Sequence, residues 1–189
     1  FINMDDLPLA RQPLVMQVGR LSEQKAPLDF VEGARIILQQ RPATRFMLIG
    51  DGPLLEQVQQ RIRDYNLQEY VTAPGAQPNA YRLIQTADIV TLTSRWEGSP
   101  YSLLEAMAWA RPVVATSVNG CPELVLDGET GYLAPSGQPQ LWAERVLRLL
   151  DDPQAAQQMG KKGRQHLEAN FTLPQMVARI TALYEQFVL

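Results

Sequence analysis

The sequence predicts an α/β domain with a doubly wound, Rossmann-like parallel sheet of about six strands and helices on both faces. Three observations support this fold class. Short, uninterrupted apolar runs recur along the chain, segments with helical periodicity separate them, and glycine or polar residues follow most runs. Uninterrupted apolar strands are typical of a parallel sheet covered on both faces, and right-handed crossovers between such strands give the doubly wound arrangement.

The elements are predicted in the following order. The strands are expected at residues 13–19, 45–50, 69–73, 87–93, 111–116 and 131–134. The helices are expected at residues 26–40, 53–65, 79–86 and 100–110, at a short segment opened by 119–123, and at 138–150, 153–170 and 173–189. The polar residues 20–25 and the residues 74–78 are predicted to be loops.

The stretch from residue 94 to residue 108 follows a buried strand and opens a helix. Ser99 is predicted to be the N-cap of that helix and Pro100 its first residue, where a missing N–H costs nothing. A helix N-terminus presents unpaired N–H groups and a positive dipole end, which suits an anionic ligand. Glu97 in the turn and Glu105, expected about two turns into the helix, would repel phosphate. We therefore predict that both carboxylates accept hydrogen bonds from hydroxyl groups, such as those of a sugar.

Composition restricts the class of protein. The 189 residues are enough for one ordinary domain, and a net charge of −3 argues against a nucleic-acid partner. The single cysteine, Cys121, excludes an internal disulfide and is typical of a reducing compartment, which predicts a cytoplasmic location. No apolar run approaches the roughly 20 residues that span a bilayer.

The chain is predicted to contain one domain with two short extensions. Residues 1–12 are interpreted as a linker remnant, because they resemble neither a signal peptide nor a natural beginning, so we expect a piece of a longer protein. Residues 13–170 form the predicted domain, and residues 171–189 a C-terminal helix. The apolar stripe of that helix consists of Leu173, Met176, Val177, Ile180, Leu183, Tyr184, Phe187 and Val188.

The carboxyl ends of parallel strands share one edge of the sheet, where ligands bind. Arg20 and Lys25 follow the first predicted strand, and Glu97 follows the fourth. There is no GxGxxG after the first strand and no P-loop, so phosphates would be held by the two cations and by helix N-termini. His166 is the only histidine and lies far along the chain, so no metal site is expected.

Seven short motifs occur in order along the chain. They are Gly-Arg-Leu-x-x-x-Lys at 19–25, Gly-Asp-Gly-Pro at 50–53, Ser-x-x-Glu-Gly-x-Pro-x-x-x-x-Glu-Ala-Met-Ala at 94–108, Pro-Val-Val-Ala at 112–115, Gly-x-x-Glu at 120–123, Asp-Gly at 127–128 and Thr-Gly-Tyr at 130–132. Any one of these motifs alone is weak, but the set resembles the C-terminal, donor-binding domain of the retaining GT-B glycosyltransferases of family 4. The resemblance covers nearly the whole chain.

The resemblance implies a role for each matching position. Arg20 and Lys25 match the pair that contacts the donor diphosphate, and Glu105 matches the glutamate that accepts hydrogen bonds from the ribose. Glu97 matches the first glutamate of the family's Glu-x7-Glu pair, at the donor sugar and reacting centre, and is the catalytic candidate. The sequence leaves open whether retention proceeds by a nucleophile, by front-face attack or by an ion-pair intermediate.

The remaining substrate-binding candidates are implied to act largely through their backbone. Gly98, Ser99 and Pro100 match the segment whose backbone meets the sugar or phosphates. The loop 74–76, which includes Gly75, would meet the base, and Gly19 opens the first motif.

The chain departs from the family pattern at three positions. Ala110 and Asn119 stand where the family usually or often has glycine, and Ala26 replaces the usual glycine after the lysine. The first is interpreted as a packing change at a helix end, the second as a change in backbone approach near Gly120, and the third as mild. None of the three affects a charged position.

These residues also have purely structural interpretations. Arg20 and Lys25 are consistent with solvated loop charges, Glu105 with a helix-surface glutamate, and Glu97 with a charge that stabilises a helix N-terminus. The other residues considered are Trp96 (packing or a wall of the sugar site), Glu123 (helix cap or ligand contact), Cys121 (structural) and His166 (helix surface).

The resemblance implies the donor-binding half of a glycosyltransferase that uses a UDP- or GDP-linked sugar without a metal ion. The acceptor would be bound by an N-terminal domain that this chain lacks, so the chain alone is expected to bind donor but not to transfer sugar. The C-terminal helix would pack toward that domain, and peripheral membrane association of the full-length enzyme is one expectation. Alternatives are a non-catalytic nucleotide-sugar-binding subunit, a dinucleotide-binding oxidoreductase domain and a sugar-nucleotide epimerase.

Overall fold

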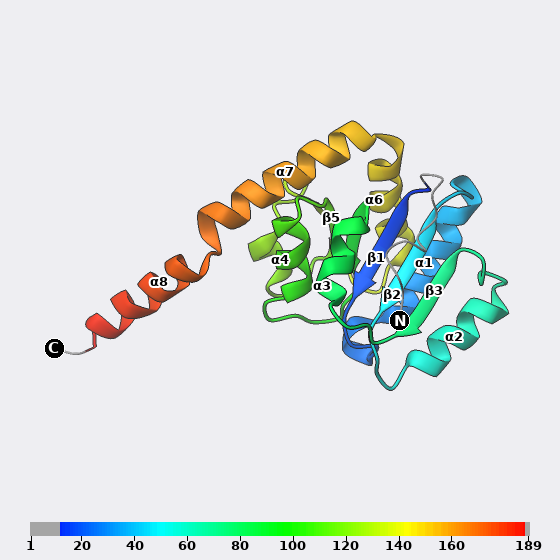
Figure 1. The fold of residues 1–189 in the computed structure, drawn as a ribbon, viewed down its shortest axis with the longest axis horizontal. Helices are drawn as coiled ribbons and strands as arrows, with labels where there is room; N and C mark the ends of the chain where they lie inside the picture. The colour runs from blue at the N-terminus through cyan, green and yellow to red at the C-terminus, as the bar shows by residue number, and fades with distance from the viewer. Residues whose placement is uncertain (1–11, 188–189) are drawn as a thin grey trace.

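The computed structural model describes residues 12–187 and contains a single six-stranded sheet (Figure 1). Its strands are β1 (Leu14–Val18), β2 (Arg45–Ile49), β3 (Val71–Gly75), β4 (Ile89–Leu92), β5 (Val113–Thr116) and β6 (Tyr132–Ala134). All pairings are parallel, and the order in the sheet is β3-β2-β1-β4-β5-β6. This is the doubly wound order, so the predicted fold class is confirmed. The predicted linker, residues 1–12, lies outside the described residues except for Gln12.

Helices cover both faces of the sheet. The α-helices are α1 (Pro27–Gln40), α2 (Leu55–Asp64), α3 (Ala80–Leu83), α4 (Tyr101–Ala108), α5 (Cys121–Leu124), α6 (Pro139–Asp151), α7 (Pro153–Asn170) and α8 (Leu173–Glu185), with 3-10 turns at Glu23–Lys25 and Ile84–Thr86. Helices α1, α2 and α6 pack on one face, whereas α3, α4 and α5 pack on the other. Because side chains alternate across a strand, Val15 belongs to the first core and Met16 to the second.

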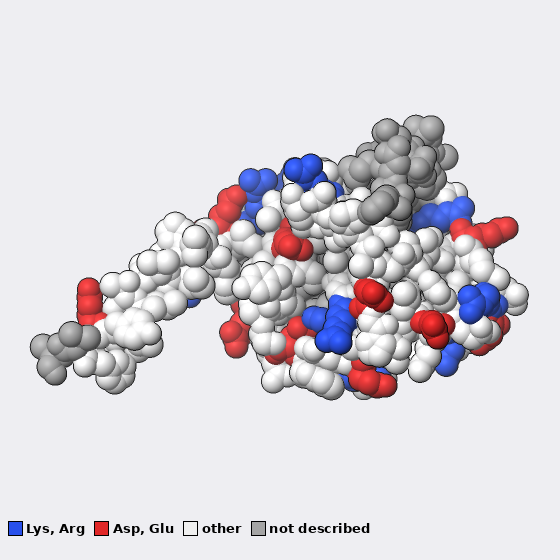
Figure 2. Space-filling view, turned by 60° about the horizontal axis from the view of Figure 1, so that its bottom comes forward, with Lys and Arg blue, Asp and Glu red and all other residues white. Residues whose placement is uncertain are grey.

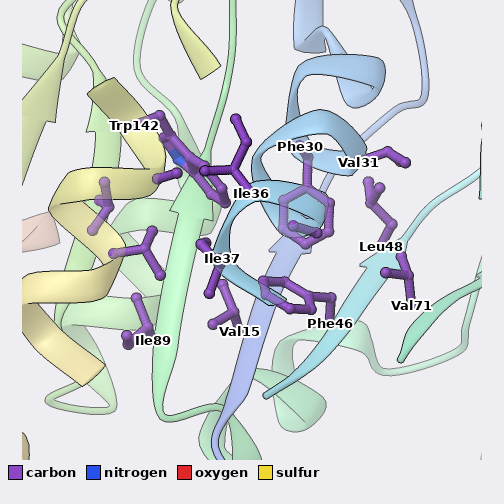
Figure 3. Close-up of a cluster of buried hydrophobic side chains, with 14 of the residues drawn as sticks. Val15, Phe30, Val31, Ile36, Ile37, Phe46, Leu48, Val71, Ile89 and Trp142 are labelled. Atoms are coloured by element: carbon purple, nitrogen blue, oxygen red, sulfur yellow. The ribbon is translucent and has the colours of Figure 1, made fainter. Parts of the chain in front are cut away.

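The first core is centred on aromatic rings between α1, α6 and the sheet (Figure 3). Phe30 contacts Phe46 edge-on at 6.0 Å and Trp142 at 5.6 Å between ring centroids. Gly33 leaves room for the indole, since a Cβ there would lie 2.4 Å from the Trp142 ring. This packing fixes α1, and with it the turn that precedes α1 at the end of β1.

Two local predictions were wrong by small shifts. Helix α4 begins at Tyr101 rather than at residue 100, and Pro100 is its N-cap with an extended ψ of 103°. Ser99 therefore lies outside the helix and does not cap it, and Glu105 is the fifth helical residue rather than two turns in. Pro74, predicted in a loop, lies within β3, which is tolerated because β3 is an edge strand and its proline needs no ladder partner.

The three departures from the family glycines share one backbone feature. Ala26, Ala110 and Asn119 all have positive φ values, of 44°, 52° and 38°. Glycine adopts this left-handed region without steric cost, whereas alanine does not. A glycine at each of these positions would therefore suit the backbone conformation that the structure has there.

Helix α8 extends away from the rest of the domain (Figure 1). It contains no buried residue, and its start is fixed by a capping box in which Thr172 and Gln175 bond reciprocally. Its apolar stripe is exposed at Leu173, Met176, Val177, Ile180, Leu183, Tyr184 and Phe187; Val188 lies outside the described residues. Within residues 12–187, the helices lack either the length or the apolar character needed to cross a bilayer.

Replacing Ala110 by glycine is expected to stabilise the domain, because it removes the steric cost of a left-handed alanine. We expect the free energy of unfolding to rise by about 1 kcal/mol. The matched control is Ala108→Gly, in helix α4 just before the same turn, which should lower it by roughly 0.5–1 kcal/mol. Urea denaturation measures both, and a loss of stability in Ala110→Gly would contradict the explanation.

Candidate functional site

The carboxyl ends of β1 and β4 meet where the strand order reverses, and they are joined by direct contacts. The N–H of Arg95 donates to the carbonyl of Gln24 at 2.7 Å, and the Gln24 amide donates to the carbonyl of Trp96 at 3.1 Å. The Thr93 hydroxyl lies 3.0 Å from the carbonyl oxygens of Lys25 and Ala26. Residues 24–26 and 93–97, here termed the β1–β4 junction, thus unite two motifs that lie about seventy residues apart in the sequence.

An ion pair lies at the centre of this junction. Lys25 Nζ is 2.5 Å from Glu97 Oε1, and the Ser94 hydroxyl donates to the same oxygen at 2.5 Å. Both side chains are largely buried, with 17% of Lys25 and 4% of Glu97 exposed. The predicted diphosphate residue and the predicted sugar residue are therefore direct partners of each other. The sequence analysis missed both this pairing and Ser94.

Arg20 lies at the same edge of the sheet but, unlike Lys25, is exposed and has no hydrogen-bond or ion-pair partner within residues 12–187. Its neighbour Gly19 lies against the Lys25 side chain, since a Cβ on Gly19 would be 3.6 Å from Lys25 Cε. The loop after β2 approaches from the other side, because a Cβ on Gly50, whose φ is 146°, would fall 1.8 Å from the Gly19 carbonyl oxygen. Arg20 is therefore a solvent-facing cation on a rigid backbone.

The glycines beside Glu97 have opposite surroundings. A Cβ on Gly120 would fall 1.7 Å from the carbonyl oxygen of Gly98, so two backbone segments are in contact there. A Cβ on Gly98 would meet nothing within 4 Å, and both Gly98 and Ser99 are exposed. Pro100 is buried beneath them. The segment before α4 therefore leaves open space next to a buried carboxylate.

Glu105 lies on the first turns of α4 and is half-buried. Burial raises the pKa of its carboxyl above the ordinary value of 4.5, because desolvation disfavours the charged form. Hydrogen bonds from a ligand would favour the charged form. Glu105 is thus a half-buried acceptor whose side chain has no hydrogen-bond donor among the described residues.

The predicted base-binding segment lies at the end of β3. Gly75 is buried with a φ of 82°, and its carbonyl accepts from the N–H of Gly50 at 3.1 Å. The Gln59 amide donates to the carbonyl of Ala73 at 3.0 Å. These bonds fix the backbone of this strand end.

Four further residues can be placed. Trp96 exposes 53% of its surface, which argues against packing as its main role. Glu123 is exposed in the short helix α5. Cys121 is buried, and burial raises the pKa of its thiol to about 11, so it is an inert structural residue. His166 is half-buried in α7, where it contacts Asn170 and Phe171.

Both acidic and basic side chains lie on the surface around the site. Acidic and basic side chains are interspersed on the face that Figure 2 brings forward. Among residues 12–187, His, Cys, Asp and Glu do not gather in groups of three that could hold a metal ion. A cleft of about 440 Å³ lies at the opposite, amino-terminal edge of the sheet, between Pro13, Asp88 and Arg111, and does not include the junction.

The fold is an α/β, Rossmann-like domain like those of GT-B glycosyltransferases, and the candidate site lies where the strand order reverses. Comparison with known proteins identifies the family. Residues 3–166 match the family described as glycosyl transferases group 1, and the chain belongs to that family.

Known relatives extend beyond this chain. The chain is 29% identical over 177 residues to an alpha-D-kanosaminyltransferase from Streptomyces kanamyceticus, covering 93% of this chain and 46% of that protein. Sucrose-phosphate synthase from Thermosynechococcus elongatus has a similar structure, with a TM-score of 0.86, 29% identity, and coverage of 97% and 47%. HepE from Anabaena, solved in complex with UDP-glucose, gives a TM-score of 0.86 at 24% identity, with coverage of 94% and 50%. The chain spans about half the length of these proteins.

Removing Lys25 is expected to destabilise the domain by leaving Glu97 charged and buried. Lys25→Met should cost about 3 kcal/mol, and the double variant Lys25→Met/Glu97→Gln should recover most of that loss, because the substituted amide keeps an acceptor for Ser94 without the charge. Arg164→Met, which breaks an exposed pair with Glu168, is the control and should cost under about 0.5 kcal/mol. Urea denaturation tests this, and equal losses in both single variants would refute burial as the cause.

Proposed function

We propose that this chain is the donor-binding domain of a retaining glycosyltransferase of family 4. It would bind a nucleotide-diphospho-sugar, linked to UDP or GDP, for transfer to an acceptor held by an N-terminal domain outside this chain. The observation that carries the proposal is that an exposed cation, Arg20, the N-terminus of α4 and the buried Lys–Glu pair of the β1–β4 junction share one sheet edge. The named transferase relatives and the UDP-glucose complex of HepE support the choice of ligand.

The diphosphate would be bound by Arg20, Lys25 and the backbone N–H groups at the start of α4. These groups carry or present positive charge, and the backbone around them is held by the contacts of Gly50 and Gln24. Charge placed in advance at the leaving diphosphate stabilises the transition state as the bond to the sugar breaks. This supply of positive charge by the protein is the reason for proposing metal-independent transfer.

Glu97 would meet the donor sugar, with the open space at Gly98 beside it. Lys25 neutralises this carboxylate, which lowers the cost of keeping both groups buried. A bound diphosphate would share the Lys25 ammonium, leaving Glu97 oriented by Ser94 alone for the sugar hydroxyls or the developing positive charge at the anomeric carbon. Front-face attack and an ion-pair intermediate are both compatible with this placement.

Glu105 would accept hydrogen bonds from the ribose hydroxyls, and the backbone at Gly75 would meet the base. Ribose donors would supply the partners that the half-buried carboxylate of Glu105 lacks among the described residues. Gly19 and the backbone of Gly98 to Pro100 complete the proposed binding surface.

The exposed stripe of α8 would pack toward the acceptor domain. Six large apolar side chains exposed on α8, with Phe187 just after it, favour a protein partner in the complete enzyme. A cytoplasmic location, with peripheral contact of the full-length enzyme to a membrane, is proposed from the single cysteine and the family resemblance.

Calorimetry with UDP, GDP and NAD tests the proposal. We expect UDP or GDP to bind in the presence of EDTA and NAD to bind more weakly. Arg20→Ala should weaken the preferred nucleotide tenfold to a hundredfold, since one charge-assisted bond contributes about 1.5–3 kcal/mol. Arg63→Ala, an exposed arginine on α2 bonded to Gln60, is the control and should bind like wild type.

Several outcomes would overturn the proposal. Preferential binding of NAD would favour a dinucleotide-dependent oxidoreductase, and unchanged affinity in Arg20→Ala would refute the diphosphate assignment. Rapid sugar transfer by these 189 residues alone would exclude the need for a second domain. Binding without transfer fits both a donor domain and a separate nucleotide-sugar-binding subunit, which the sequence encoded upstream of Phe1 distinguishes.

Nucleotide affinity is expected to depend on the ionisation of Glu105. Burial raises the pKa of this carboxyl, and ribose hydroxyls would bind its charged form, so ligand binding would lower that pKa and release protons. UDP affinity should therefore be greatest above the raised pKa and should decrease as the pH falls through it. Glu105→Gln cannot titrate and should lack this component. Calorimetry of both proteins from about pH 5 to pH 8 measures the difference, and parallel profiles would argue against ribose binding by Glu105.

A further inference from the structure

Two polar side chains lie in the core directly below the junction. Gln17 belongs to the central strand β1, and Thr93 follows the last residue of β4. Each exposes only 1% of its surface, whereas the positions around them in both strands are mainly apolar. Burying an amide and a hydroxyl is unfavourable unless their hydrogen bonds are made, so their partners are informative.

The partners of Gln17 and Thr93 are each other and the backbone that carries Lys25. The Gln17 amide donates to the carbonyl of Lys25 at 3.3 Å. The Thr93 hydroxyl lies 3.1 Å from Gln17 Oε1 and 3.0 Å from the carbonyl oxygens of Lys25 and Ala26. The network therefore reaches from the middle of the sheet to the backbone of one cation at the ligand edge.

The backbone held in this way has an unfavourable conformation. Ala26 has a φ of 44°, and it separates the 3-10 turn that ends at Lys25 from helix α1, which begins at Pro27. A left-handed alanine persists only where its surroundings determine it. The Gln17 amide donates to the Lys25 carbonyl, and the Thr93 hydroxyl, which has a single proton, is placed to donate to the Ala26 carbonyl.

We propose that Thr93, together with Gln17, is a positioning residue for Lys25. The pair fixes the carbonyls of Lys25 and Ala26, so that the ammonium emerges at the sheet edge within reach of Glu97 and of the donor diphosphate. This inference rests on the proposed function, since it assigns Lys25 to the diphosphate. Because Thr93 and Gln17 are both buried, they would act on the ligand only through Lys25.

The experiment compares two buried threonines of the same strand region by calorimetry with UDP, or with GDP if that is the nucleotide the wild type prefers. Thr93→Val removes the hydroxyl under Lys25 at nearly constant volume and should weaken binding about threefold to tenfold. Thr93→Ser keeps the hydroxyl and should bind within about twofold of wild type. Thr91→Val is the matched control, because the Thr91 hydroxyl bonds the carbonyl of Met16, away from the junction, and its loss should leave affinity unchanged.

A double-variant comparison with Lys25 distinguishes positioning by Thr93 from a purely structural role. In a Lys25→Ala background, Thr93→Val should have no further effect on affinity, because the group it positions is gone. If Thr93→Val does not fold, Gln17→Met, which removes the donor to the Lys25 carbonyl, replaces it in the same comparison.

Two outcomes would overturn the inference, and they are distinguishable. Wild-type affinity in Thr93→Val, with a melting temperature lowered as in Thr91→Val, would show that the hydroxyl serves stability alone. Absence of UDP and GDP binding by the wild-type chain would instead remove the proposed function, and this inference with it.

Discussion

The site depends on the contact between the turn after β1 and the segment after β4. Residues 24–26 and 93–97 are held together by backbone bonds, by the Gln24 amide and by the Lys25–Glu97 pair. Strands β1 and β4 are neighbours because the strand order reverses between them. In this six-stranded order it is the one place where the connections that leave two adjacent strands run away from each other across the sheet. The proposed ligand contacts are all arranged around this junction.

Burial determines whether each of the two cations proposed for the diphosphate has a protein partner. The buried cation has a partner, since Lys25 lies against Glu97 and would otherwise leave an uncompensated charge. The exposed cation, Arg20, has no protein partner within the described residues and is solvated instead. An anion would thus find one cation immediately accessible and a second that is already oriented.

The backbone near the site is strained where other members of the family are expected to have glycine. Ala26 and Asn119 hold left-handed conformations beside Lys25 and Gly120. Such conformations cost free energy that the surrounding bonds must offset. At Ala26 the offsetting interactions are those of the polar network of Gln17 and Thr93, and near Asn119 they include the contact of Gly120 with the Gly98 carbonyl. Site geometry here is therefore imposed by the fold rather than by local preference.

The sequence by itself determined the fold class, the number of strands and the placement of Arg20, Lys25 and Glu97 at one edge of the sheet. It could do so because apolar runs, helical periodicity and glycine positions are local patterns, and because parallel strands must end at a common edge. The motifs in their order along the chain also indicated a glycosyltransferase, and the family match shows that the chain belongs to glycosyl transferases group 1.

Only the tertiary structure decided which of those residues are partners. The Lys25–Glu97 pair, the Ser94 bond and the network of Gln17 and Thr93 join segments brought together by the pairing of β1 with β4, and such contacts leave no periodic signal. The start of α4 was also visible only in the tertiary structure, where Pro100 is extended and takes the N-cap position in place of Ser99. Local patterns identify candidates, whereas burial and the crossing of distant segments determine their charge state, partners and orientation.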